Sequence, residues 1–81
     1  EAVSRLWPGY LHGVIVRPDP KKGEQLVLFT NFPLAERPPL VSFWKEQGLA
    51  ELSLPRVIKM ITDFPLLGSG KINYRALEEE R

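Results

Sequence analysis

Hydrophobic and polar positions fall into short blocks separated by proline and glycine, and the first block predicts a helix over residues 1–7. Its apolar residues recur at helical spacing, and Pro8-Gly9 ends the pattern. These residues are Ala2, Val3, Leu6 and Trp7. A strand is predicted next, from His12 to Arg17, because the segment contains consecutive β-branched residues. The apolar run is continuous, so we expect this strand to be buried on both faces.

The next block predicts an antiparallel hairpin. Residues 18–24 are rich in turn formers and charge, and the apolar segment from Gln25 to Thr30 predicts a second strand. Lys21 and Lys22 lie at the polar tip of this hairpin. They are candidate contacts for an acidic partner such as a carrier protein, although a lysine pair at a hairpin tip is more often solvated surface.

Proline marks the start of the second helix. A proline-rich connector follows the second strand, and Pro38-Pro39 fit only the first turn of a helix. We expect this helix to run to Gln47, with Gly48 as the residue that ends it. Its apolar face is expected to pack on the sheet. This face holds Leu40, Phe43 and Trp44.

After a connector over residues 49–55, a third strand is predicted from Arg56 to Thr62, with apolar side chains on both faces. Asn73 is suited to cap a final helix in which Tyr74 and Leu77 share a face. The predicted order is therefore helix, strand, strand, helix, strand, loop, helix. We predict a small two-layer α+β domain, in which the hairpin and the third strand form a three-stranded sheet covered by helices.

Composition and charge narrow the possible functions. The 81 residues make one domain whose 43% hydrophobic and 26% charged content is typical of soluble globular proteins. A net charge of +1 lacks the basic field that nucleic-acid binding needs, so we expect no nucleic-acid partner. The chain has no cysteine, and His12 has no second ligand at metal spacing, so we expect no metal site and a structural role for His12. No apolar run reaches the length of a membrane span.

The candidate chemistry lies between the third strand and the final helix. Gly68 and Gly70 can adopt positive φ and approach a ligand closely, and Ser69 offers a hydroxyl group. Lys71 brings a compact cation with three donors, which suits a phosphate or carboxylate oxygen. A phosphate-binding P-loop is excluded, because the positions that require glycine and serine or threonine hold Pro65 and Ile72. Taken alone, this short run is more often a flexible turn with a solvated lysine.

The longer run from Pro65 to Leu77 resembles the last motif of the adenylate-forming superfamily, which includes acyl-CoA synthetases, nonribosomal peptide adenylation domains and luciferases. The motif is a proline, a short spacer, Ser/Thr-Gly-Lys, an aliphatic residue and a polar stretch ending in leucine. The positions that fit are Pro65, Ser69, Gly70, Lys71, Ile72, Arg75 and Leu77. Tyr74 departs from it, since many members carry a basic residue there. An Asp, spacer, Gly-Glu pattern also matches at Asp19, Gly23 and Glu24.

The order of predicted elements is similar to the C-terminal subdomain of these enzymes over essentially all of residues 1–81. Within the superfamily, the chain most resembles the acyl-[acyl-carrier-protein] synthetase half of bifunctional 2-acylglycerophosphoethanolamine acyltransferases. The segments that carry this closer resemblance are Trp7-Pro8-Gly9, Pro18 to Glu24, Gln47-Gly48, Glu51-Leu52, Leu54-Pro55-Arg56 and Pro65 to Lys71. The chain begins at Glu1 rather than Met, so we expect it to be part of a longer protein.

The resemblance implies a two-step reaction in the full-length enzyme. A fatty acid carboxylate attacks ATP to give an acyl-adenylate, and a thiol of acyl carrier protein or CoA then takes the acyl group, which bifunctional relatives pass to a lysophospholipid. Lys71 matches the adenylation lysine. ATP and Mg²⁺ would bind mainly to a larger N-terminal domain, so no cofactor and no catalysis are expected for these residues alone. The expected location is the cytoplasm or the inner membrane surface.

A different class of function stays open at this point. The chain could be a stand-alone adaptor that binds a carrier protein through Lys21 and Lys22, or a structural domain in which Lys71 is merely solvated.

Overall fold

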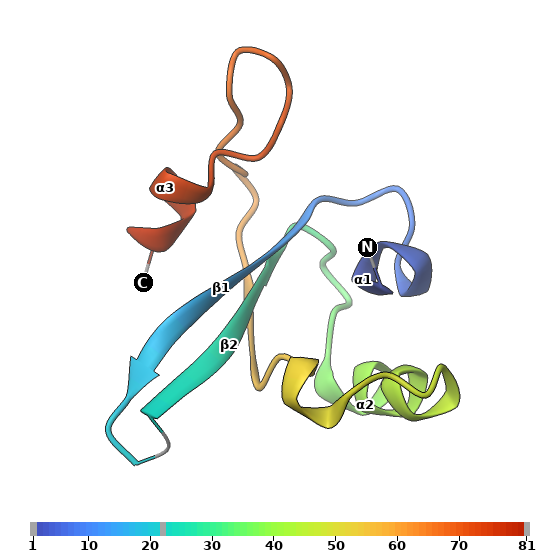
Figure 1. Cartoon of the computed structure of the whole chain (residues 1–81). Coiled ribbons are helices and arrows are strands. Elements are labelled where there is room, and N and C mark those ends of the chain that lie inside the picture. The colour runs from blue at the N-terminus through green and yellow to red at the C-terminus, as the bar shows by residue number, and fades with distance from the viewer. Residues whose placement is uncertain (1, 22, 81) are drawn as a thin grey trace.

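The computed structural model describes residues 2–21 and 23–80, and its elements follow the predicted order (Figure 1). They are α1 (Ala2–Leu6), β1 (His12–Asp19), β2 (Gly23–Thr30), α2 (Arg37–Glu46), a 3₁₀ turn (Glu51–Ser53), β3 (Val57–Met60) and α3 (Tyr74–Glu78). The predicted α+β class is confirmed. Within the described ranges, every helix is too short or too polar to cross a membrane.

The sheet has the order β1-β2-β3, with β2 at its centre. Strands β1 and β2 pair antiparallel, from His12 opposite Thr30 to Asp19 opposite Gly23. Strands β2 and β3 pair in parallel, with Val27 opposite Val57. A parallel pair needs a long crossover between its strands, and the segment containing α2 provides it. The connector before β3 also contains the 3₁₀ turn, which the sequence did not predict.

Helices cover both faces of this sheet, so the protein has two apolar clusters. Figure 1 shows α1 and α2 on one side of the β1–β2 hairpin and α3 on the other. The cluster on the side of α1 and α2, called here the helical core, consists of Val3, Trp7, Leu28, Leu40 and Trp44. The cluster under α3, called here the C-terminal core, consists of Ile15, Val27, Phe29, Phe64 and Leu77. Strand β2 contributes to both clusters.

The prediction that the first strand is buried on both faces is wrong. The side chains of Val14 and Val16 are 38% and 54% exposed, whereas Ile15 between them is buried. The physical reason is that β1 is an edge strand, and the helical core forms over Leu28 of β2. Strand β1 also runs two residues beyond the prediction, to Asp19, because an edge strand tolerates Pro18.

Local signals located the helix ends well. Proline occupies the first turn of α2, and Gly48 follows its C-cap with φ of 66°. Asn73 caps α3 by accepting a hydrogen bond from the backbone N–H of Ala76 at 3.2 Å. All three predictions are confirmed. The third strand is shorter than predicted, since only Val57–Met60 pair with β2.

The single histidine of the chain is part of a hydrogen-bonded chain at the end of the β1–β2 ladder. His12 Nε2 lies 2.8 Å from the carbonyl oxygen of Trp7, and His12 Nδ1 lies 2.8 Å from Oγ1 of Thr30. A carbonyl only accepts, so neutral His12 carries its proton on Nε2 and accepts the hydroxyl proton of Thr30 on Nδ1. Thr30 Oγ1 in turn accepts from the N–H of Phe32 at 3.1 Å. Both ring nitrogens of His12 therefore have a hydrogen-bond partner, as expected for a satisfied histidine.

This arrangement predicts a pH-dependent stability. Burial lowers the pKa of His12 from its ordinary 6.5, against the smaller opposing effect of the Trp7 carbonyl. The unfolded chain therefore binds a proton more readily than the folded one. We expect the free energy of unfolding to be highest above pH 6.5 and to fall as the pH drops below 6.5 towards the lowered pKa.

Urea denaturation at pH 7.5 and 5.5, followed by tryptophan fluorescence, measures this dependence. The matched control is His12→Gln, which cannot titrate and should show a smaller loss between the two pH values. Equal losses in the two proteins would assign the pH dependence to other groups.

Candidate functional site: the Lys71 hairpin

Lys71 lies at the end of a small, closed hairpin. Leu66 and Ile72 form an antiparallel bridge. The N–H of Leu67 donates to the carbonyl of Lys71 at 2.7 Å, and the N–H of Gly70 donates to the carbonyl of Leu67 at 2.9 Å. Gly70 has φ of 90°, as expected for a three-residue hairpin loop that ends in the left-handed region. Of the two glycines predicted to allow positive φ, only Gly70 uses it.

The base of the Lys71 hairpin is fixed by residues on both sides of it. Phe64 and Leu77 are buried in the C-terminal core, before and after the hairpin. The N–H of Asn73 donates to the carbonyl of Pro65 at 3.0 Å. The guanidinium of Arg17 lies over the Phe29 ring and donates to the carbonyl oxygens of Glu78 and Glu80, which joins the end of α3 to β1.

The tip of the Lys71 hairpin faces solvent. Gly68, Ser69, Gly70 and Lys71 are all exposed. The flanking apolar side chains are also about half exposed. These are Leu66, Leu67 and Tyr74. An ammonium group with apolar neighbours can enter a cleft of another protein part and reach an anionic oxygen there. Because the tip is exposed, the hairpin cannot exclude water from the ammonium group by itself.

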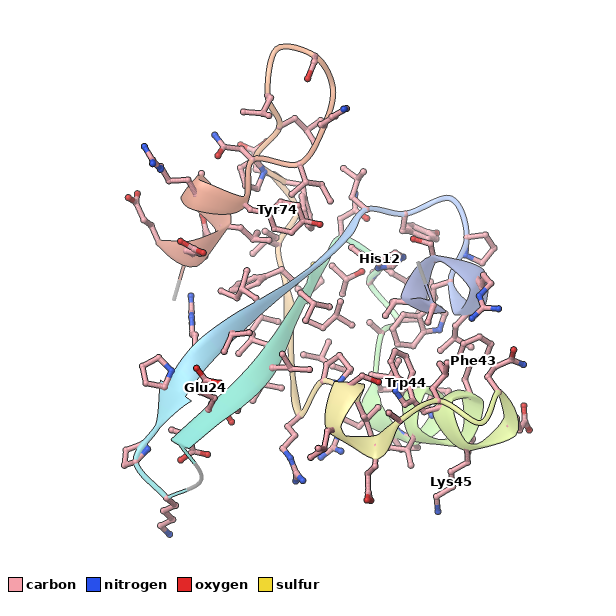
Figure 2. All side chains as sticks on the ribbon, viewed as in Figure 1. His12, Glu24, Phe43, Trp44, Lys45 and Tyr74 are labelled. Atoms are coloured by element: carbon pink, nitrogen blue, oxygen red, sulfur yellow. The ribbon has the colours of Figure 1, made fainter. Side chains whose placement is uncertain are left out.

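A groove of about 570 Å³ begins at the base of this hairpin. Ile72 and Tyr74 contribute to its wall, together with His12, Val14 and Trp44 (Figure 2). The remaining lining residues are Ala2, Val3, Ser4, Leu49 and Ser53. Its walls come from four segments that are distant in sequence, so no local pattern could have predicted it.

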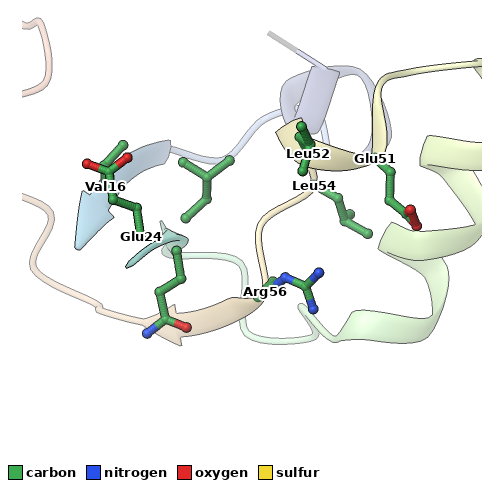
Figure 3. A pocket seen from close by; sticks show the side chains of 8 residues that line it. Val16, Glu24, Glu51, Leu52, Leu54 and Arg56 are labelled. Atoms are coloured by element: carbon green, nitrogen blue, oxygen red, sulfur yellow. The ribbon is translucent and has the colours of Figure 1, made fainter. Parts of the chain in front are cut away.

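A second, smaller pocket of about 280 Å³ lies between the β1–β2 hairpin and the 3₁₀ turn (Figure 3). It is lined by Val16, Glu24, Gln25, Leu26, Glu51, Leu52, Leu54 and Arg56. None of these residues belongs to the Lys71 hairpin. The pocket is therefore separate from the candidate site.

The two groups of predicted site residues are not brought together. Lys21 is exposed at the tip of the β1–β2 hairpin, where its N–H donates to Oδ1 of Asp19 at 2.9 Å. Lys22 lies outside the described residues. Figure 1 shows the β1–β2 tip and the Lys71 hairpin at opposite ends of the molecule. One bound molecule of small size could therefore not contact both.

Within residues 2–21 and 23–80, no group of three or more His, Asp or Glu side chains is placed to hold a metal ion.

Comparison with known proteins agrees with this geometry. No family model matches the chain. Among solved structures, an acyl-CoA synthetase from Brucella canis is 26% identical with a TM-score of 0.69, covering 94% of this chain and 15% of that one. A fatty acyl CoA synthetase from Mycobacterium tuberculosis is 26% identical with a TM-score of 0.69, covering 89% and 15%. ATP-bound MatB from Rhodopseudomonas palustris is 20% identical with a TM-score of 0.72, covering 96% and 16%.

The chain thus spans about one sixth of the length of the proteins it matches. Its α+β fold, with the Lys71 hairpin between β3 and α3, is similar to one segment of acyl-CoA synthetases, which supports the predicted resemblance to the adenylate-forming superfamily.

Proposed function

We propose that this chain is the C-terminal lid domain of an ATP-dependent fatty acid ligase and that Lys71 is its adenylation lysine. The observation that carries the proposal is the Lys71 hairpin. It presents an exposed cation on a closed turn whose base is anchored in the C-terminal core. The similarity of the fold to acyl-CoA synthetases supports the same assignment.

The chemistry explains why a lysine is useful there. When a fatty acid carboxylate attacks the α-phosphate of ATP, two anions meet, and an acyl-adenylate forms as pyrophosphate leaves. A positioned cation offsets the repulsion and stabilises the charge that develops on the reacting oxygens. The apolar side chains of Leu66 and Leu67 would shield the ammonium from water once the hairpin enters a cleft, which strengthens the electrostatic interaction.

The rest of the site would come from a larger N-terminal domain of the same protein. That domain would bind ATP, Mg²⁺ and the acyl chain, in keeping with the one-sixth coverage of the matched synthetases. Rotation of the lid after adenylation would remove Lys71 and let a thiol of acyl carrier protein or CoA enter. We propose acyl carrier protein or CoA as the thiol acceptor, with Lys21 and Lys22 as candidate contacts for a carrier protein, and a lysophospholipid as the final acceptor at the inner membrane surface.

The first test replaces Lys71 with alanine in the full-length parent protein. We expect acyl-adenylate formation from ATP and fatty acid to fall by about 10² to 10³-fold, because one stabilising donor is lost. Thioester formation from preformed acyl-adenylate should remain, since the lysine has left the site by then. Rapid-quench measurement of each half-reaction gives both values.

Lys45→Ala is the matched control, because Lys45 is an exposed lysine on α2, far from the hairpin in Figure 2. It should leave both half-reactions unchanged. If Lys71→Ala also leaves adenylation unchanged, the hairpin is only a turn, and the adaptor or structural interpretation replaces this one.

The hairpin geometry generates a second test within the chain itself. Gly70→Ala should lower the free energy of unfolding by about 1–2 kcal/mol, because alanine is disfavoured in the left-handed region. Gly68→Ala is the control, since a Cβ there meets no atom within 4 Å and the backbone is not left-handed. Urea denaturation of both variants measures the difference. Equal stability would contradict the closed hairpin.

A further inference from the structure

Gly13 lies where β1 packs against the C-terminal segment. It is buried and pairs with Phe29 across the β1–β2 ladder. A Cβ atom at Gly13 would lie 2.6 Å from Cδ2 of Leu77, 3.5 Å from Cε1 of Tyr74 and 3.6 Å from Cζ of Phe64. Its φ is not in the left-handed region, so the backbone does not require glycine here. The requirement is for space.

A methyl group at this position requires Leu77 to shift, because 2.6 Å is too short for a contact between two carbon atoms. Leu77 is fully buried in the C-terminal core, together with Phe64 and Phe29. Protein interiors are close-packed, so a shift of Leu77 presses on these neighbours and on its own helix. An outward movement of α3 would relieve the clash. Tyr74, the other residue of α3 near Gly13, is half exposed and would move with the helix.

The residues that meet Gly13 are the same ones that hold the Lys71 hairpin. Phe64 precedes the hairpin, whereas Tyr74 and Leu77 follow it. Asn73, between Lys71 and α3, joins the two sides through its hydrogen bond to Pro65. A shift of α3 away from β1 is therefore transmitted to the hairpin over a few bonds.

We propose that Gly13 is a positioning residue for Lys71. Because glycine has no side chain, the residues that flank the Lys71 hairpin can pack closely against β1, and this close packing fixes the position of the hairpin. The proposal rests on the proposed function of Lys71. Because a misplacement of about 1 Å can cost roughly 10²-fold in rate, a methyl group at position 13 should act on the adenylation step although it touches no substrate.

The experiment uses the full-length parent and measures both half-reactions, at a temperature where each variant is fully folded by tryptophan fluorescence. We expect Gly13→Ala to slow acyl-adenylate formation by about 10 to 10²-fold and to leave thioester formation from preformed adenylate within about twofold. Adding Leu77→Val, which withdraws the clashing methyl, should restore most of the lost rate. Lys45→Ala is the control and should behave like the wild type, because Lys45 is an exposed residue of α2 that belongs neither to the Lys71 hairpin nor to the contacts of Gly13.

The outcomes separate this proposal from the one on which it rests. If Lys71→Ala slows adenylation but Gly13→Ala behaves like the Lys45→Ala control, the positioning role is wrong and the proposed function stands. If Gly13→Ala slows both half-reactions equally, Gly13 is only a packing residue, and the proposal is overturned. If Lys71→Ala has no effect on adenylation, the proposed function is wrong, and the proposal for Gly13 is overturned with it.

Should Gly13→Ala fold poorly, the double variant Gly13→Ala with Leu77→Val decides. It keeps the methyl group at position 13 and shortens the side chain at position 77, so that the methyl group has room. Recovery of folding, with adenylation within about threefold of the rate of Leu77→Val alone, supports the proposal, because the defect of Gly13→Ala is then assigned to its contact with Leu77. A tenfold loss with normal thioester formation would overturn it, because relief of the Leu77 contact would then have changed nothing.

Discussion

Strand β2 is hydrogen-bonded along both edges, and its side chains alternate between two apolar clusters. Leu28 points into the helical core, whereas Val27 and Phe29 point into the C-terminal core. All three are at most 2% exposed. A domain of this size buries only roughly 60% of the surface of its unfolded chain. This short chain forms a packed interior because both faces of its central strand are covered.

The position of the candidate lysine follows from this constraint. Helix α3 has five residues, too few to be stable in isolation. It is helical because Asn73 caps it and because Leu77 is buried against β1 and β2. Phe64 is buried in the same cluster as Leu77. The chain therefore leaves the C-terminal core after Phe64 and returns to the same core at Leu77. The hairpin between these anchors presents Lys71 as a consequence of packing two hydrophobic residues.

The sequence could predict features that depend on one residue and its neighbours. Proline in the first turn of α2, Gly48 after its end and Asn73 before α3 each act locally, and each was found in place. The exposure of Val14 and Val16 could not be predicted, because it depends on which strand lies at the edge of the sheet. The parallel pairing of β2 with β3 depends equally on tertiary structure. The candidate lysine was found through a motif, whereas the role of Gly13 needed the contact with Leu77, 64 positions away in sequence.

The separation of the two clusters also bears on how the molecule opens. Hydrogen exchange in folded proteins proceeds through cooperative units that unfold one at a time, and the units with the least buried surface open first. The segment from Phe64 onwards is held by the C-terminal core and by Arg17, while α1 and α2 depend on the helical core alone. We expect the segment from Phe64 onwards, which carries Lys71, to exchange as one cooperative unit, because its buried residues Phe64 and Leu77 lie in one cluster.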